Sequence, residues 1–491
     1  MSILEERIEH IVVLMLENRS FDNLLGQLRP ASAAYNGLSG SESNPLNIRS
    51  AAQTIGVWNQ PGLDPDTMTI PTPDPGETWD DMNAQLFGFG GTPGLQIPPM
   101  SGFVDNYVGH GGMFHTARSP RAPMHYFTPD QVPVLSQLAN AFAVSDQWFA
   151  SAPCQTWPNR FFLHTGTAGR YANNQMFRPH EMPTIFTRFN AHEQPDGWKV
   201  YFHDVPQCFA LTDLWHHRDH FHLYEQFAQD IADGSLPSYT FIEPRYFPDM
   251  DFPSDMHPPH DITFGEQLIA DVYNTLRASS YWDKSLLIIT FDEHGGCYDH
   301  VPPPRAVSPD GEPSREGFTF NRYGVRVPAV LVSPYIKAGT ILRIASTLPH
   351  QGPPYPFDHT SVIATLRQRF TLGGPLTHRD GAAPHLGTVF TLTGPDNLGP
   401  QRLTVSTAEQ GNERLEADRH RPLSDLQVSL HALAAHLPSI IDDVNHAEQT
   451  ITTHITAWRE GTQRIDVPDH KTSLEAVPYI KEQVRRFLAW V

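Results

Sequence analysis

Residues 11–16 read IVVLML, and the chain continues at once with ENRSFDNLLG at residues 17–26. Six consecutive apolar residues are typical of a strand that is buried on both faces, as in a parallel sheet covered by helices. The pattern recurs in SLLIITFD at 285–292 and in VPAVLV at 327–332, and WKVYF at 198–202 predicts a fourth strand. Amphipathic segments separate these strands, so the sequence predicts a three-layer α/β fold with long loop insertions.

Two segments between the strands have helical periodicity. Val132–Phe142 carries one apolar stripe, and Asp261–Ser279 carries another, with Thr263 and Glu266 spaced as a capping box. After residue 399 the pattern changes to leucines three or four residues apart, at positions 423, 426, 430, 433 and 437. We therefore predict a main domain over 1–399 and a mainly helical extension over 400–491, or alternatively a helical layer packed on the main core.

The composition excludes several classes of protein. The 491 residues include 34 Lys plus Arg and 54 Asp plus Glu, a net charge of −20, which excludes nucleic acid as a partner and attraction to anionic lipid. The three cysteines cannot form a disulfide framework, and we expect free thiols. The first ten residues lack the basic start of a signal peptide, which favours a cytoplasmic location; unconventional export or a processed secreted form remains open.

Polar residues follow two of the predicted core strands. IVVLML ends at Glu17 and Asn18, and the strand over 285–291 ends at Asp292 and Glu293. The carboxyl ends of parallel strands form the active-site edge of α/β sheets, and carboxylate and amide oxygens are the ligands that hard divalent cations prefer. The sequence therefore predicts one divalent metal ion at this edge, of unspecified identity.

Thr156 lies in the segment SAPCQTWPNRFF, two residues before Pro158. Proline is favoured in the first turn of a helix, so Thr156 is expected near a helix N-terminus, where backbone N–H groups favour a phosphate. A metal could activate its hydroxyl as a nucleophile. The alternative is a threonine that only caps the helix.

Histidines at two further places are candidates to contact phosphate or to protonate a leaving group. His257 and His260 lie in the stiff segment DMHPPHD at 255–261, and His203 follows the predicted strand WKVYF.

Four of these segments resemble a known family. ENRSFDNLLG, TWPNRFFLHTG, FDEHGGCYDHVPPP and HPPHD are similar to the phosphoesterase family of bacterial and plant non-specific (phosphatidylcholine-preferring) phospholipases C and a related acid phosphatase, over residues 8–370. The resemblance implies an alkaline-phosphatase-like catalytic domain, with one metal held by Glu17, Asn18, Asp292 and Glu293. It also implies that Thr156 is nucleophile and fifth ligand, and that His257 contacts the phosphate. Further substrate contacts are expected from residues within and beside these motifs: Trp157, Asn159, His260, His294 and Tyr298.

The chain departs from the family at Glu77, in the segment DPGETWDDMNAQLFG, where members usually read DPGH. A carboxyl group donates a proton only if its pKa is raised, so the departure transfers the role of leaving-group acid to His203 or His257.

These observations predict a metal-dependent phosphoric-ester hydrolase, best matched by a phospholipase C that releases diacylglycerol and phosphocholine through a phospho-threonine. The alternatives are an acid phosphatase, a non-catalytic metal-binding module, or an interaction factor that uses the C-terminal helices. Oligomeric state is left open. The uncharged segment LFGFGGTPGLQIPPMSGF at 86–103 is a candidate membrane-interface contact, or else a buried loop. Arg19 is expected to pair with Asp22 or Asp146.

Overall fold

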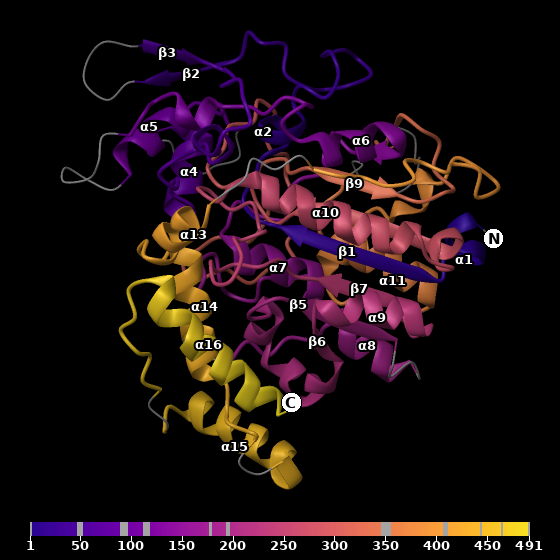
Figure 1. Ribbon diagram of the computed structural model, residues 1–491, viewed down its shortest axis with the longest axis vertical. Helices are drawn as coiled ribbons and strands as arrows, with labels where there is room; N and C mark the ends of the chain where they lie inside the picture. The colour runs from indigo at the N-terminus through magenta and orange to yellow at the C-terminus, as the bar shows by residue number, and fades with distance from the viewer. Residues whose placement is uncertain are drawn as a thin grey trace.

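The computed structural model describes residues 2–46, 53–88, 97–110, 118–175, 179–192, 197–344, 355–405, 411–441, 444–462 and 465–489. Within these ranges the core is a mixed eight-stranded sheet of order β10-β4-β9-β8-β1-β7-β5-β6 (Figure 1). Its strands, in chain order from β1 and then β4, are His10–Leu16, Ala143–Val144, Trp198–Phe202, Phe221–Leu223, Tyr239–Ile242, Ser285–Phe291, Ala329–Val332 and Thr340–Ile341. A separate hairpin pairs β2 (Ser43–Leu46) with β3 (Gln53–Gly56).

The central strand β1 is fully apolar from Ile11 to Leu16 and runs parallel to both of its neighbours, β7 and β8. All seven residues of β8 are buried. This confirms the predicted α/β fold. The third predicted strand forms β9, but it runs antiparallel to β8, because burial on both faces does not fix a strand's direction.

Helices cover both faces of the sheet (Figure 1). On one face α10 (Ile262–Arg277) packs against α6 (Pro133–Ala141) and α9 (Glu225–Asp233). On the other, α11 (Thr360–Phe370) packs against α7 (Thr156–Thr165) and α1 (Ile3–Arg7), and α7 packs against α8 (Ile185–Ala191). The shorter helices are α2 (Phe21–Leu25), α3 (Pro65–Met68), α4 (Trp79–Phe87), α5 (Phe103–Gly109) and α12 (His378–Ala382).

The expected capping box of α10 is wrong. Asp261 is the N-cap residue and accepts the backbone N–H of Thr263. The Glu266 carboxylate instead accepts the N–H groups of Val134 and Leu135 at the start of α6. Glu266 therefore links two helices on one face of the sheet.

The C-terminal helices are α13 (Asn412–Arg419), α14 (Asp425–His436), α15 (Ala447–Glu460) and α16 (Ser473–Leu488). α14 packs on α16, and the Phe487 ring of α16 lies edge-on to Phe209 with centroids 5.0 Å apart. The amide of Gln427 donates to the carbonyl of Tyr246. These helices thus share one apolar core with the sheet, and the boundary at 399/400 stays a prediction.

The uncharged segment at 86–103 is largely internal where it is described. Leu86, Met100 and Phe103 are buried in one apolar cluster, and Phe87 lies under the guanidinium of Arg322. Only Ile97 is well exposed among its described apolar residues, at 78%. Phe89 and Leu95 lie outside the described residues, so contact of this segment with a membrane stays a prediction. Among the described residues, we find no helix whose length and apolar character would suit it to cross a bilayer.

Candidate active site at the carboxyl end of the sheet

The ends of β1 and β8 bring the four predicted ligand residues together. The backbone N–H of Asn18 donates to Asp292 Oδ1 (2.9 Å), and its side-chain amide donates to Glu293 Oε1 (2.6 Å). Asn18 holds φ at 56°, in the left-handed region. Its backbone carbonyl lies so close to Gly295 that a Cβ there would approach to 2.1 Å. The contact requires glycine at 295 and fixes the two strand ends against each other.

Thr156 is the first residue of α7 and points its hydroxyl at the end of β1. Its Oγ1 lies 3.3 Å from both Glu17 Oε2 and Asn18 Oδ1. The alternative of a capping threonine is wrong, because Gln155 occupies the N-cap position and makes no side-chain cap bond. The Thr156 hydroxyl is therefore free of a helix-capping role and faces the acidic cluster.

Arg160 and Gln207 hold Glu17 in place. Arg160 forms a buried ion pair with Glu17 Oε1 (2.5 Å), and the Gln207 amide donates to the same oxygen (2.7 Å). Burial raises the pKa of Glu17, Arg160 opposes that rise, and Asp292 adds to it; the balance leaves the pKa well above its usual range. With Oε1 occupied on one side, Oε2 remains directed at Thr156.

The donor set fits a hard metal ion. Asp292 Oδ2 is buried and has no hydrogen-bond partner, beside the carboxylates of Glu17 and Glu293 and the oxygens of Asn18 and Thr156. Burial first, and then the charges of Glu77 and Asp292, raise the pKa of Glu293 well above its usual range. A divalent cation relieves this repulsion between buried carboxylates. The fold and these groups together indicate a metal ion.

Asp74, Glu77 and His257 form a second polar group within electrostatic reach of the first. His257 Nε2 lies 3.4 Å from Glu77 Oε2, and His257 Nδ1 lies 3.8 Å from Asp74 Oδ1. Burial alone would lower the pKa of His257, but Glu77 and Asp74 outweigh it, so the pKa is raised well above its ordinary value. The backbone N–H of Glu17 donates to the carbonyl of Asp255 (2.8 Å), two residues before His257, which brings the two groups close together.

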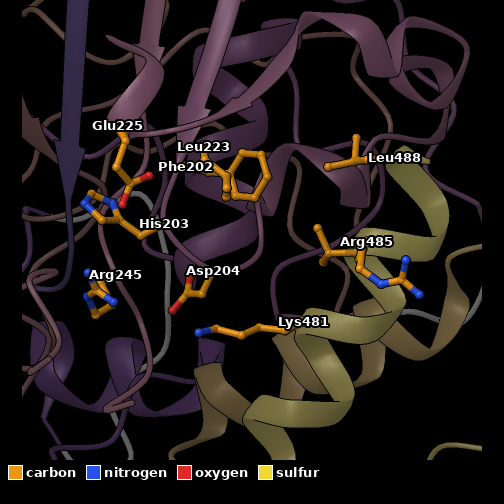
Figure 2. A pocket seen from close by; sticks show the side chains of 10 residues that line it. Phe202, His203, Asp204, Leu223, Glu225, Arg245, Lys481, Arg485 and Leu488 are labelled. Atoms are coloured by element: carbon orange, nitrogen blue, oxygen red, sulfur yellow. The ribbon is translucent and has the colours of Figure 1, made fainter. Parts of the chain in front are cut away.

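His203 lies elsewhere. It lines a pocket of about 440 Å³ between the ends of β5 and β6 and helix α16, together with Asp204, Arg245 and Lys481 (Figure 2). Its ring stacks on Tyr224, its Nδ1 lies 3.0 Å from the carbonyl of Glu243, and burial lowers its pKa to about 4. β7 separates β5 from β1 in the sheet, which places His203 at the end of a more distant strand.

The five predicted substrate contacts are engaged with the protein to different degrees. The Asn159 amide bonds the backbone of Ala152 and Cys154, and so ties the preceding loop to α7. His260 contacts Asp255 Oδ1 at 2.6 Å. Their roles toward substrate stay predictions.

The three remaining predicted contacts are buried. Trp157 is 1% exposed and lies edge-on to the ring of His180. Tyr298 lies edge-on to Phe103. His294 Nε2 lies 2.8 Å from Gln85 Oε1, and burial lowers its pKa to about 3. Their roles toward substrate likewise stay predictions.

The expected partners of Arg19 are wrong. Arg19 donates to the backbone carbonyls of Met256 and Ile70. Asp22 pairs with Arg326, and Asp146 pairs with Arg343. Arg19 thus holds the loop that carries His257 against the loop before Glu77.

Sequence reasoning missed Gln207 and Asp74. Gln207 is the first residue of a short 3-10 helix, Gln207–Ala210, after β5, and nothing in its spacing points to Glu17. The sequence does contain a signal for Asp74, because it lies three residues before Glu77 in a loop that three prolines stiffen.

Comparison with known proteins identifies the family. The Phosphoesterase family model matches residues 8–373. The chain is 37% identical to non-specific phospholipase C6 of Arabidopsis thaliana, over 87% of this chain and 80% of that protein. It is 27% identical to phospholipase C A of Mycobacterium tuberculosis (strain ATCC 25618 / H37Rv), over 79% of this chain and 78% of that protein.

Among solved structures, one of a protein in the alkaline phosphatase superfamily from Vibrio parahaemolyticus is 13% identical, with a TM-score of 0.30, and the match covers 52% of this chain and 63% of that chain. The fold assignment rests on the sheet itself. The family match spans the motifs that supply Glu17, Thr156, His257 and Asp292, and by that match the chain belongs to the Phosphoesterase family.

Proposed function

We propose that this phosphoric-ester hydrolase of the phospholipase C type cleaves phosphatidylcholine into diacylglycerol and phosphocholine, with Thr156 as the nucleophile. The observation that carries the proposal is that Glu17 and Asn18 each lie 3.3 Å from the Thr156 hydroxyl at the start of α7, while Asn18 in turn donates to Asp292 and Glu293. A catalytically silent module would need no hydroxyl there. The names of the relatives support the phospholipase reading.

The first half-reaction forms a bond between Thr156 Oγ1 and phosphorus while the bond from phosphorus to the diacylglycerol oxygen breaks. The proton of Thr156 passes to Glu17 Oε2, the carboxylate oxygen 3.3 Å away.

The second half-reaction restores the enzyme. Water attacks phosphorus and releases one proton to solvent, which balances the proton that the departing diacylglycerol oxygen takes up from solvent. The bond to Thr156 Oγ1 breaks, and the threonine oxygen recovers its proton from Glu17. We propose that a positive centre at His257 faces the leaving oxygen. His203 lines the pocket beside α16, and we assign it no step.

A metal ion held by Glu17, Asn18, Thr156, Asp292 and Glu293 would supply Lewis-acid stabilisation of the phosphoryl oxygens and lower the pKa of the Thr156 hydroxyl. We propose one divalent ion at this position.

A substrate panel tests the assignment. Purified chain is assayed on phosphatidylcholine, phosphatidylethanolamine and p-nitrophenyl phosphate, after chelation and again after metal is added back. We expect diacylglycerol from phosphatidylcholine, dependent on metal. Hydrolysis of p-nitrophenyl phosphate with no diacylglycerol from any phospholipid would favour an acid phosphatase instead.

A further inference from the structure

Besides the residues at the strand ends, two clusters among the described residues each bring together three Asp, Glu or His side chains that could hold a metal ion. The first consists of Asp22, Asp299 and His300, and its charges are already matched. Arg326 donates to Asp22 Oδ1 and Asp299 Oδ1, each at 3.0 Å, while His300 Nδ1 lies 2.6 Å from Asp22 Oδ2. This cluster is therefore a buried salt-bridge network whose ligand atoms are already engaged.

The second cluster, Asp74, Glu77 and His257, still has ligand atoms without a partner. Asp74 Oδ1, Glu77 Oε1 and His257 Nε2 are buried and have no hydrogen-bond partner. His257 is 1% exposed and Glu77 is 7% exposed. Among the described residues, only His257 stands within ion-pair distance of either carboxylate. The nearby Arg118 donates to the backbone carbonyl of Asp74.

The hydrogen bond of His257 Nδ1 shows which ring nitrogen is available to bind a cation. Its Nδ1 lies 2.6 Å from the carbonyl of Pro258, an acceptor only, so Nδ1 carries a proton. In the neutral ring Nε2 then presents a lone pair to Glu77 Oε2, 3.4 Å away. Two lone pairs repel each other, so Nε2 binds either a proton or a metal cation. Metal-bound histidines commonly donate their other N–H to a backbone carbonyl in this way.

The spacing suits a metal as that cation. Ligands about 2.0–2.1 Å from a tetrahedral Zn²⁺ lie about 3.3 Å apart, close to the 3.4 Å between His257 Nε2 and Glu77 Oε2. The ligand atoms of all three side chains lie within 4.8 Å of one another. We propose that Asp74, Glu77 and His257 hold a second divalent cation of the Zn²⁺ class, beside the ion bound by the strand ends.

Glu77 joins Asp74 and His257 to give one imidazole and two carboxylates, and imidazole nitrogen and carboxylate oxygen are both ligands that Zn²⁺ accepts. The second cation would be the positive centre that faces the leaving oxygen. That role rests on the proposed function, whereas occupancy of the site does not.

Metal counting tests occupancy without any assay of activity. The full chain is stripped by dialysis against chelator, reloaded with Zn²⁺, passed through gel filtration and analysed by mass spectrometry for zinc per chain. We expect two equivalents for the wild type, one for Glu77→Gln, one for Asp292→Asn and none for the double variant. His300→Gln, in the matched salt-bridge cluster, should keep two. Asp74→Asn, on a partly exposed loop, replaces Glu77→Gln if that variant does not fold.

The pattern of losses separates this inference from the proposed function. If the wild type and Glu77→Gln bind the same amount of zinc, the second site is refuted and the cation at His257 is a proton. If Glu77→Gln loses one equivalent while Asp292→Asn loses none, the second site stands and the ligand set at the strand ends is wrong.

Discussion

Replacing Thr156 with alanine should abolish turnover while leaving the fold intact. The substitution removes Oγ1, the atom 3.3 Å from Glu17 and Asn18. Loss of the nucleophile should lower kcat/KM by at least ~10³-fold, or about 4 kcal/mol of transition-state stabilisation. The free energy of unfolding should change by no more than about 1 kcal/mol, because Thr156 caps no helix and alanine is a better helix former.

The assay compares kcat/KM on short-chain phosphatidylcholine with the midpoint of urea unfolding. Thr156→Ser keeps the hydroxyl and should therefore retain most of the activity that Thr156→Ala loses. Thr165→Ala, at the other end of α7, removes a buried hydroxyl that donates to the carbonyl of Phe161, and should leave kcat unchanged. Activity of Thr156→Ala within tenfold of the wild type would refute the nucleophile.

Four further outcomes are expected. Asp292→Asn should lose activity and bound metal, and chelation should lower the Tm of the wild type, since a metal that binds only the folded state stabilises it; an unchanged Tm would contradict the metal site. Arg160→Met should lower the free energy of unfolding by about 3–5 kcal/mol, because it leaves Glu17 buried without its partner; calorimetry measures this. Burial lowers the pKa of His125 to about 3 and of His180 to about 4, so both rings take up protons when the chain unfolds at mildly acidic pH. The free energy of unfolding should therefore fall as the pH drops from about 6.5 toward 4, by about 1 kcal/mol per pH unit for each ring. Urea titrations from pH 5 to 8 check the direction of this change. Cys154, Cys208 and Cys297 are free and buried, so thiol counting should give three after denaturation and none before it.

The strands and the residues that follow them could be predicted from the sequence. Unbroken apolar runs are rare outside buried strands, and in β1 and β8 the run stops where the polar ligand residues begin. Parallel pairing of these two strands then brings Asn18 next to Asp292 without further information.

Side-chain partners and distant strands could not be predicted in the same way. The strand β7, YTFI, is only four residues long, too short to stand out, yet it lies between β1 and β5, the strand that precedes His203. Arg19 lies three residues from Asp22 in sequence, but its side chain turns to the carbonyls of Met256 and Ile70. The spacing of residues along the chain does not predict such side-chain contacts.

The position of β1 at the centre of the sheet has a consequence for how the chain is made. β1 is synthesised first, but its neighbours β7 and β8 begin at Tyr239 and Ser285. At about 5–20 residues per second, a ribosome needs roughly 10–45 s after Leu16 to reach β7. During that interval the apolar segment IVVLML belongs to a nascent chain that has no strand to pair with it. We therefore expect it to be a target for chaperones that bind emerging chains.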